Sequence, residues 1–323
     1  MTTRREMLVA LGTLTALPAL AQQGVKMPLI GVLEREPGSE NLEAFRQGMR
    51  ERGYVDGKNI VFEYRYTHGK IAEFPRLAAE LVQRKVDLIF AGSTPGARAA
   101  QGATNTIPIV FAVVSDPVGA KLIASLPKPG GNATGMTTNN VEIVGKRLSI
   151  LKEISGGKTA RAAMLMDPSD ASNVLSLQAA LEPARKLGMT LQAFPVKGPE
   201  EFDAAFSGMV SARIDALLVT AGVSMNSHAK RIAELAAKSR LPAMYAASEF
   251  VDAGGLVSYA ASFADNYRRA AAYVDKILKG ASPRDLPVEQ ASTLELTINR
   301  KAANALGLNL TSTILLQATR VIE

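Results

Sequence analysis

Small polar and acidic residues follow several apolar segments of this sequence, and these junctions are where its binding chemistry should lie. Ser93 and Thr94 follow the apolar run 86–90, and Asp116 follows the run 108–114. The other junctions are Asp167 to Asp170, Gly222 to Ser227 and Tyr245 to Glu249. A serine or aspartate here can cap the next helix, and the free amides at a helix N-terminus can also bind an anion. For any single junction, helix capping is the simpler interpretation.

Taken together, the junctions predict one shared ligand site. The carboxyl ends of parallel strands lie along one edge of a sheet, where open α/β proteins bind their ligands. Helix N-terminal amides would hold a carboxylate, and Asp116, Asp167 or Glu249 would take an ammonium group. This pairing predicts an amino-acid-like ligand. The candidate ligand-binding residues are Ser93, Thr94, Asp116, Asp167, Ser169, Gly222, Tyr245 and Glu249.

Patterns for catalysis, metals and cofactors are weak. The chain has no cysteine and only two histidines, His68 and His228, which are far apart in the sequence. Zinc chemistry is therefore nearly excluded, and no Gly-x-Ser-x-Gly nucleophile motif is present. The segment 156–159 (GGKT) resembles the end of a phosphate loop, but the first glycine of that motif would fall on Lys152. We expect no cofactor, no metal and no catalytic residue, although catalysis by carboxylates alone stays an alternative.

The N-terminus has the pattern of a secretory signal peptide. Arg4 and Arg5 precede an apolar run, 7–21, which ends in Ala19-Leu20-Ala21. We expect export by the Tat or Sec route with cleavage near Ala21, and a periplasmic location. The run is shorter than the ~20 residues of a membrane-spanning helix. Because no second run approaches that length, we expect no stable membrane insertion.

Composition and charge fit an ordinary globular protein. The chain has 323 residues, of which 47% are hydrophobic, and it is long enough for one large or two medium domains. The net charge is +7, but the basic residues are scattered among acids, as around Arg46, Arg50 and Glu51. This scatter favours a solvated basic surface, and no nucleic-acid partner is expected.

Hydrophobic periodicity predicts an α/β fold with two doubly wound halves. Short apolar runs alternate with amphipathic segments from residue 28 to residue 136, and the alternation begins again at 160. Continuous apolar strands imply parallel sheets covered on both faces. A helix is expected over 118–126, directly after the Asp116 junction. Two facing α/β lobes would leave a cleft between them, the usual place for a small ligand.

Four segments are similar to one family, the ABC-transporter substrate-binding proteins of the tryptophan/tyrosine-uptake type. They are GMRERGYVDGKNIVFE (48–63), GSTPGARAA (92–100), SDPVGAKLIASLPKPGGNATG (115–135) and LPAMYAASEFVDAGGLVSY (241–259). The resemblance covers essentially the whole chain after the signal peptide. It implies a periplasmic-binding-protein fold of type I, with two Rossmann-like lobes, three crossovers, a hinged cleft and no catalysis.

The resemblance also implies boundaries and roles. The first lobe would comprise 28–136 plus about 257–298, and the second 137–256 plus about 299–323. Ser93 and Thr94 would hold the ligand carboxylate, with Asp116 close by, and an aromatic ligand side chain is one option. The first loop, Glu34-Arg35-Glu36-Pro37-Gly38, departs from the small, polar loop expected at this position because it is more charged.

The function expected from these observations is that of an exported solute receptor. It would capture its ligand by hinge closure and deliver it to an ABC permease driven by a cytoplasmic ATPase, as a monomer. One alternative is a ligand-sensing periplasmic protein that reports to a membrane receptor. A periplasmic enzyme that uses cleft carboxylates is a second alternative. A repressor effector domain is disfavoured because the signal peptide stands where a helix-turn-helix would be needed.

Overall fold

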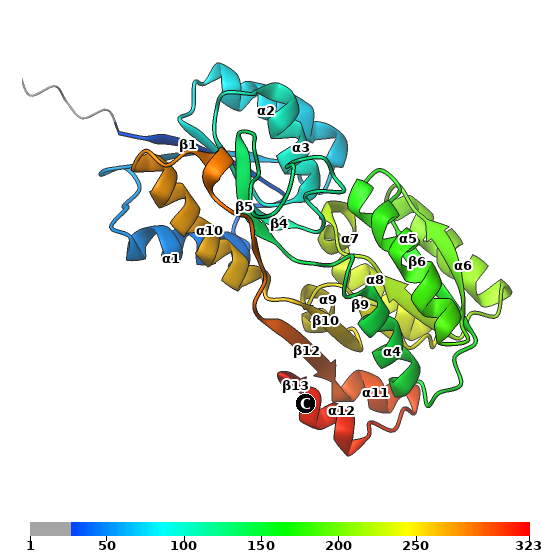
Figure 1. Cartoon of the computed structure of the whole chain (residues 1–323). Coiled ribbons are helices and arrows are strands. Elements are labelled where there is room, and N and C mark those ends of the chain that lie inside the picture. The colour runs from blue at the N-terminus through cyan, green and yellow to red at the C-terminus, as the bar shows by residue number, and fades with distance from the viewer. Residues whose placement is uncertain (1–26) are drawn as a thin grey trace, which may run out of the picture.

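The computed structural model describes residues 27–323. The expected signal peptide and its cleavage near Ala21 lie outside these residues. Within 27–323, no helix combines the length and apolar character that crossing a bilayer requires. Two α/β lobes lie end to end along the long axis of the molecule, and each is built on one sheet (Figure 1). The predicted fold class, two doubly wound lobes, is confirmed.

The first lobe is built on a six-stranded sheet of order β11-β5-β4-β3-β1-β2, in which every pair is parallel. Its early elements are β1 Leu29–Glu34, α1 Glu40–Glu51, β2 Val61–Tyr66, α2 Phe74–Gln83, β3 Leu88–Ala91, α3 Thr94–Ala103, β4 Ile109–Val114 and β5 Ala133–Thr137. Two later elements, α10 Phe263–Leu278 and β11 Glu289–Gln290, complete it. Helix α10 packs so closely on α1 that a Cβ at Gly48 would lie 2.6 Å from the carbonyl oxygen of Arg268.

The second lobe is built on a seven-stranded sheet of order β13-β12-β10-β9-β8-β6-β7. Its first elements are α4 Val144–Ile154, β6 Arg161–Met166, α5 Ala171–Lys186, β7 Thr190–Pro195, α6 Phe202–Ser211, β8 Ala216–Val219, α7 Val223–Ser227 and α8 Ala229–Lys238. The remainder are β9 Ala243–Tyr245, α9 Glu249–Asp252, β10 Val257–Ala261, β12 Leu294–Asn299, α11 Arg300–Leu306, α12 Ser312–Gln317 and β13 Arg320–Ile322. Only the β10–β12 pair is antiparallel among the described strands.

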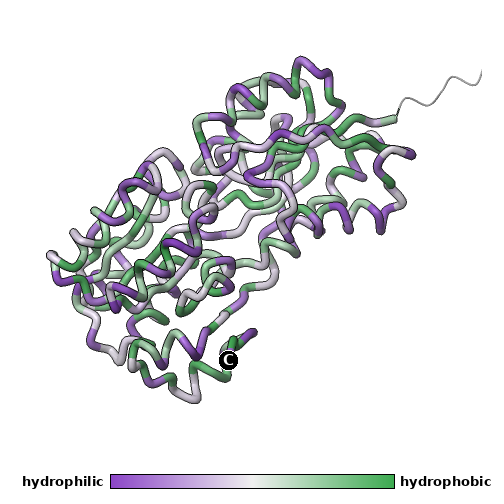
Figure 2. Tube along the Cα trace, turned by 180° about the vertical axis from the view of Figure 1, so that it is seen from behind, coloured by the Kyte–Doolittle hydropathy of each residue, from purple (hydrophilic) through white to green (hydrophobic). Residues whose placement is uncertain are grey.

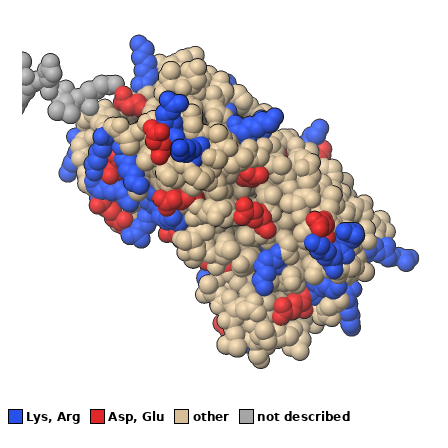
Figure 3. Space-filling model, viewed as in Figure 1, with Lys and Arg blue, Asp and Glu red and all other residues tan. Residues whose placement is uncertain are grey.

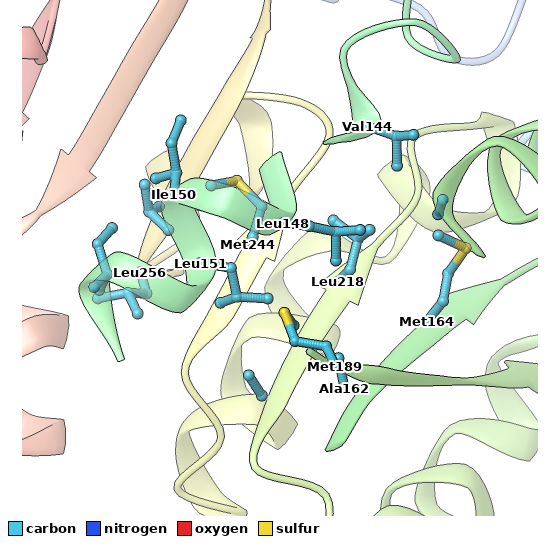
Figure 4. Close-up of a cluster of buried hydrophobic side chains, with 14 of the residues drawn as sticks. Val144, Leu148, Ile150, Leu151, Ala162, Met164, Met189, Leu218, Met244 and Leu256 are labelled. Atoms are coloured by element: carbon cyan, nitrogen blue, oxygen red, sulfur yellow. The ribbon is translucent and has the colours of Figure 1, made fainter. Parts of the chain in front are cut away.

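Apolar side chains on both faces of each sheet form the cores. Figure 2 shows hydrophobic residues concentrated along the strands inside each lobe, with hydrophilic residues recurring on the outer turns. In the second lobe, Leu148 and Leu151 of α4 pack with Leu218 of β8 and Met244 of β9 (Figure 4). On the face drawn in Figure 3, lysine and arginine side chains are dispersed among acidic ones.

The chain crosses between the lobes three times, as the resemblance implied, but two crossings differ from the expected boundaries. The crossings follow β5, β10 and β11. Residues 257–261 and 294–298 were expected in the first lobe, yet they form β10 and most of β12 in the second sheet. The reason is strand pairing: Val257 pairs with Met244 of β9, and Ile298 pairs with Val257. The segment between β10 and β12 that returns to the first lobe contains α10 and β11.

The helix expected over 118–126 is absent, which corrects that prediction. Residues 117–121 form a hydrogen-bonded turn, and Lys121 adopts a left-handed conformation with φ of 58°. A left-handed residue cannot continue a right-handed helix. The backbone amides of Leu122 and Ile123 both bond to the carbonyl of Pro117, which closes the turn.

Candidate functional site

The two lobes face each other across a cavity with about 620 Å³ of empty space, part of it open to solvent. Most of the first-lobe lining comes from the carboxyl ends of β1, β3 and β4, and most of the second-lobe lining from the ends of β6, β8 and β9. The polar residues that line it are Glu34, Arg35, Ser39, Asn41, Ser93, Thr94, Ser115, Asn140, Asp170, Ser172, Asn226, Glu249 and Tyr267. This edge-on-edge arrangement is the one that the five sequence junctions predicted.

Four of the eight predicted site residues line the cavity: Ser93, Thr94, Gly222 and Glu249. Ser93 is the N-cap of α3, and its Oγ accepts a hydrogen bond of 3.2 Å from the amide of Gly96. Thr94 Oγ1 accepts one of 3.4 Å from the amide of Ser115, which ties the ends of β3 and β4 together. Capping and cavity lining therefore occur together at this junction.

The other four predicted residues do not line this cavity. Asp116 Oδ1 accepts a hydrogen bond of 2.8 Å from the amide of Gly119 and so caps its own turn. Asp167 is buried, and its Oδ1 accepts from the amide of Ser169 at 2.8 Å. Ser169 lines a second opening between α3 and the start of α5. Tyr245 is buried in the core of the second lobe, where its ring stacks on that of Phe250.

Asp170, and not the predicted Asp167, is the acidic residue of the junction 167–170 that lines the cavity. Asp170 is the N-cap of α5, and its Oδ1 accepts hydrogen bonds from the amide and the hydroxyl of Ser172, at 2.9 and 2.7 Å. Oδ2 is directed toward Gly222, where an added Cβ would lie 3.0 Å away. Burial raises the pKa of the Asp170 carboxyl to about 6. One feature of the sequence could have identified Asp170: it stands directly before the helix, at the capping position.

A second buried carboxyl, that of Glu34, lies at the end of β1. Tyr267 of α10 donates its hydroxyl to Glu34 Oε1 at 2.7 Å, and the amide of Arg35 donates to Oε2 at 3.2 Å. Burial raises the pKa of Glu34 to about 7, although both hydrogen bonds act to lower it. Gly92 leaves room for this pair, since a Cβ there would lie 1.9 Å from Glu34 Oε1. Sequence reasoning missed Tyr267 because α10 is remote in the chain.

An ion pair joins the lobes across the cavity. Both terminal nitrogens of Arg35 lie 3.2 Å from Oε2 of Glu249. Asn41 donates to Oε1 of the same carboxylate at 3.2 Å, and Asn226 donates to Oε2 at 3.1 Å. The side chains of Arg35 and Glu249 are 18% and 29% exposed. The charged first loop noted in the sequence therefore supplies one half of a contact between the lobes.

The buried side chain of Arg147 of α4 joins the first crossing to strand β10. It is 2% exposed, and its Nε donates to the carbonyl of Tyr259 at 2.7 Å. Its two terminal nitrogens donate to the backbone carbonyl and to Oδ1 of Asn140, at 3.1 and 2.6 Å. Removal from water lowers the pKa of its guanidinium to about 9. Asn140 lies in the first crossing, and Tyr259 lies in β10, the strand that precedes the second crossing. The side chain of Arg147 therefore fixes the first crossing against that strand.

Acidic and histidine side chains do not gather into a metal site here: residues 27–323 contain no group of three or more that could hold an ion. His68 is exposed and paired with Glu36, and His228 contacts the carbonyl of Ser224. The polar groups around the cavity are hydrogen-bond donors, acceptors and single charges. Such an arrangement can bind and orient a small polar solute.

Solved structures of similar fold include the ABC domain from Streptococcus pneumonia in complex with L-Trp. It is 27% identical, with a TM-score of 0.85 over 92% of this chain and 100% of that chain. A ligand-free, open structure of a substrate binding protein with adhesive properties from Clostridium difficile is also 27% identical. Its TM-score is 0.64 over 92% of this chain and 99% of that chain. The type I periplasmic-binding-protein fold is confirmed.

A curated relative and a family model agree with these structures. A tyrosine-binding protein of Clostridioides difficile (strain R20291) is 27% identical over 266 residues, which are 82% of this chain and 76% of that protein. The model of the family described as ABC transporter substrate binding protein matches residues 26–322. The resemblance drawn from the sequence is confirmed, and the chain belongs to the ABC transporter substrate-binding protein family.

Proposed function

We propose that this protein is the exported substrate-binding component of an ABC importer and that its cleft binds a small solute, the zwitterion of an amino acid. In this proposal it works in the periplasm and delivers its ligand to a membrane permease driven by a cytoplasmic ATPase. Family membership supports the transport role. Two relatives, one a tyrosine-binding protein and one in complex with L-Trp, support an amino acid as ligand.

The observation that carries the proposal is the placement of Asp170 across the cleft from the N-terminus of α3. The two features line one cavity but belong to different lobes. Ser172 engages Oδ1 of Asp170, and Oδ2 is directed to the Gly222 side of the cavity. An ammonium group placed there would form a charge-assisted hydrogen bond with a buried carboxylate, which is strong because the local dielectric is low.

The N-terminus of α3 suits the carboxylate of the same ligand. The helix has ten residues, and its aligned peptide dipoles place partial positive charge at Ser93 and Thr94. Ser93 Oγ already accepts a hydrogen bond from Gly96, so its proton remains available for donation to a carboxylate oxygen. A zwitterion would thus bridge the lobes, with its negative end on the first lobe and its positive end on the second.

Hinge closure is the proposed mechanism of capture. A ligand that contacts both lobes stabilises the closed state by its differential affinity for the two states. The lobe arrangement supports this, because the TM-score is 0.85 to the complex with L-Trp and 0.64 to the ligand-free, open structure at the same 27% identity. The contact between Arg35 and Glu249 belongs to this closed arrangement.

A thermal-shift screen of the exported, processed protein against the twenty amino acids tests the proposal. Ligand at about 100 times its dissociation constant should add about 2.7 kcal/mol of stability. Asp170→Asn keeps a good helix cap but removes the charge, so it should weaken binding about 10- to 100-fold. The matched control is Glu182→Gln, because Glu182 is an exposed carboxylate on α5 that is paired with Lys186. This variant should bind the ligand with unchanged affinity. The proposal fails if no amino acid raises the midpoint.

A further inference from the structure

The cavity has two unlike sides. A second opening, between α3 and the start of α5, shares Thr94, Pro95 and Asp170 with the cavity. The four residues Arg35, Asn41, Asn226 and Glu249 line the cavity but not that opening. We call these four the polar wall. Because Ser93, Thr94 and Asp170 would hold the carboxylate and the ammonium group, the side chain of the ligand is left to the remaining lining, which includes the polar wall.

The polar wall is a connected hydrogen-bond network rather than an apolar pocket. Glu249 accepts from Arg35, Asn41 and Asn226, and Asn226 Oδ1 accepts from the amide of Gly222 at 3.0 Å. A ligand side chain that lies against this wall removes it from water. The charged groups of Arg35 and Glu249 would lose their remaining hydration, so a ligand side chain that offers them hydrogen-bonding groups is favoured over an apolar one.

Aromatic residues give little support for an aromatic ligand side chain. Within the lining, only Phe263 and Tyr267 are aromatic. Tyr267 is 4% exposed, its hydroxyl is donated to Glu34, and its ring packs edge-on against Phe90. Phe263 packs against the core cluster of the second lobe that contains Tyr245. An indole or phenol ring would therefore find no open stacking face among the described lining residues apart from the exposed part of Phe263.

The charges in the lining are unbalanced. Its acids are Glu34, Asp170 and Glu249, and its one base is Arg35. Arg35 is paired with Glu249, and the α-ammonium of the ligand would pair with Asp170. Glu34 then remains as a buried carboxyl with no ion pair of its own, since its hydrogen bonds come from the hydroxyl of Tyr267 and the amide of Arg35, and the guanidinium of Arg35 is bonded to Glu249. A positive charge on the ligand beside Glu34 would favour its ionised form and balance it.

We infer that the ligand is an amino acid whose side chain carries a cationic hydrogen-bond donor, an ammonium or a guanidinium group, and that the polar wall together with Glu34 selects it. This inference rests on the proposed function of the cleft as an amino-acid site. It separates the specificity of this chain from that of the relatives that bind tyrosine or L-Trp. A site built to hydrogen-bond a polar group rejects analogues that lack it far more strongly than an apolar pocket rejects a polar isostere.

Calorimetric titration of the exported, processed protein with L-lysine, L-ornithine, L-arginine, L-glutamine, L-glutamate, L-tyrosine and L-tryptophan tests the inference. At least one cationic amino acid should bind about 10-fold or more tighter than glutamine, and about 100-fold tighter than glutamate, tyrosine or tryptophan. If glutamate, tyrosine or tryptophan binds tightest, the inference is overturned while the amino-acid receptor stands. If no amino acid binds, the proposed function and the inference both fall.

Two variants locate the selectivity. Glu34→Gln keeps an acceptor for the hydroxyl of Tyr267. Glu249→Gln removes the charge and keeps one acceptor oxygen, which can serve Asn41 or Asn226 but not both. Each should reduce the preference for the cationic ligand over glutamine about 10-fold, whatever the change in the affinity for glutamine itself. The readout is the ratio of the two affinities in one protein, so a general loss of stability does not imitate it. A preference unchanged in both variants, as in the control Glu182→Gln, contradicts the assignment.

Discussion

The guanidinium of Arg35 lies 3.2 Å from the carboxylate of Glu249, and the two residues belong to different lobes. Arg35 follows β1, and Glu249 begins α9 after a strand of the other sheet. The pair is partly exposed, so its contribution to stability is modest, about 1 kcal/mol or less. If the cleft closes by a hinge as proposed, a contact of this size would bias the closed state without locking it.

Arg35→Ala should shift the ligand-free protein toward the open form. A loss of about 1 kcal/mol changes the equilibrium between closed and open forms about fivefold. The measurement is small-angle X-ray scattering without ligand, in which the variant should have the larger radius of gyration. Arg185→Ala, an exposed arginine on α5 with no described partner, serves as the control. Identical scattering curves for Arg35→Ala and the unaltered protein would rule out a role of this ion pair in closure.

The stability of the ligand-free protein should fall as pH rises from about 4.5 to about 7. Burial raises the pKa of Glu34 from 4.5 to about 7, with Tyr267, Arg35 and Glu249 as the groups that face it. The folded state therefore binds more protons than the unfolded state between these values, and the free energy of unfolding decreases with pH in this window. The loss is on the order of 3 kcal/mol.

Glu34→Gln tests this pH dependence, since the amide cannot ionise. Chemical denaturation at about pH 6 and pH 8 should give a clear loss of stability in the unaltered protein and a flatter dependence in the variant. The elevated pKa of Asp170, about 6, acts in the same direction, but mostly below pH 6 and so outside the interval between the two measurements. An equal slope in both proteins would show that the ionisation of Glu34 does not limit stability.

Gly92→Ala should be strongly destabilising. Its Cβ would lie 1.9 Å from Glu34 Oε1 and 2.1 Å from the hydroxyl oxygen of Tyr267, so one of these buried groups must move. We expect a loss of about 2–3 kcal/mol in the free energy of unfolding. Gly102→Ala in the same region is the control, because nothing lies within 4 Å of its Cβ in helix α3. It should leave stability unchanged or raise it by up to about 1 kcal/mol.

Arg147→Met should cost about 3 kcal/mol or more. The change leaves the carbonyls of Tyr259 and Asn140, together with Asn140 Oδ1, without their donors in a buried place. Urea denaturation measures the loss. Arg185→Ala should remain within about 0.5 kcal/mol of the unaltered protein. A loss for Arg147→Met as small as that of the control would contradict the view that Arg147 holds the first crossing against strand β10.

The sequence predicted the lobes and their facing junctions because both depend on local pattern. Alternation of apolar and amphipathic segments is visible in the chain, and Ser93 and Thr94 follow a strand and begin a helix in the structure as expected. Sheet membership was harder. The strand Val257–Ala261 would be buried in either sheet, and only its pairing with β9 decides which.

The choice between Asp167 and Asp170 shows a second limit of sequence reasoning. Both acids belong to one junction, but the side chain of Asp167 bonds to the amide of Ser169 while Asp170 caps α5 and reaches the cavity. The contact of Tyr267 with Glu34 joins residues 233 positions apart. No local pattern encodes such a contact, because tertiary packing alone creates it.

The central proposal is that the two lobes recognise opposite ends of a zwitterion, its carboxylate and its ammonium group. Calorimetric titration with the best-bound amino acid, its α-amide and its analogue without the α-ammonium group tests this most directly. We predict that the amide, which lacks the carboxylate, and the deaminated analogue each bind about 10- to 100-fold more weakly than the amino acid. Equal affinity for all three compounds would contradict the account.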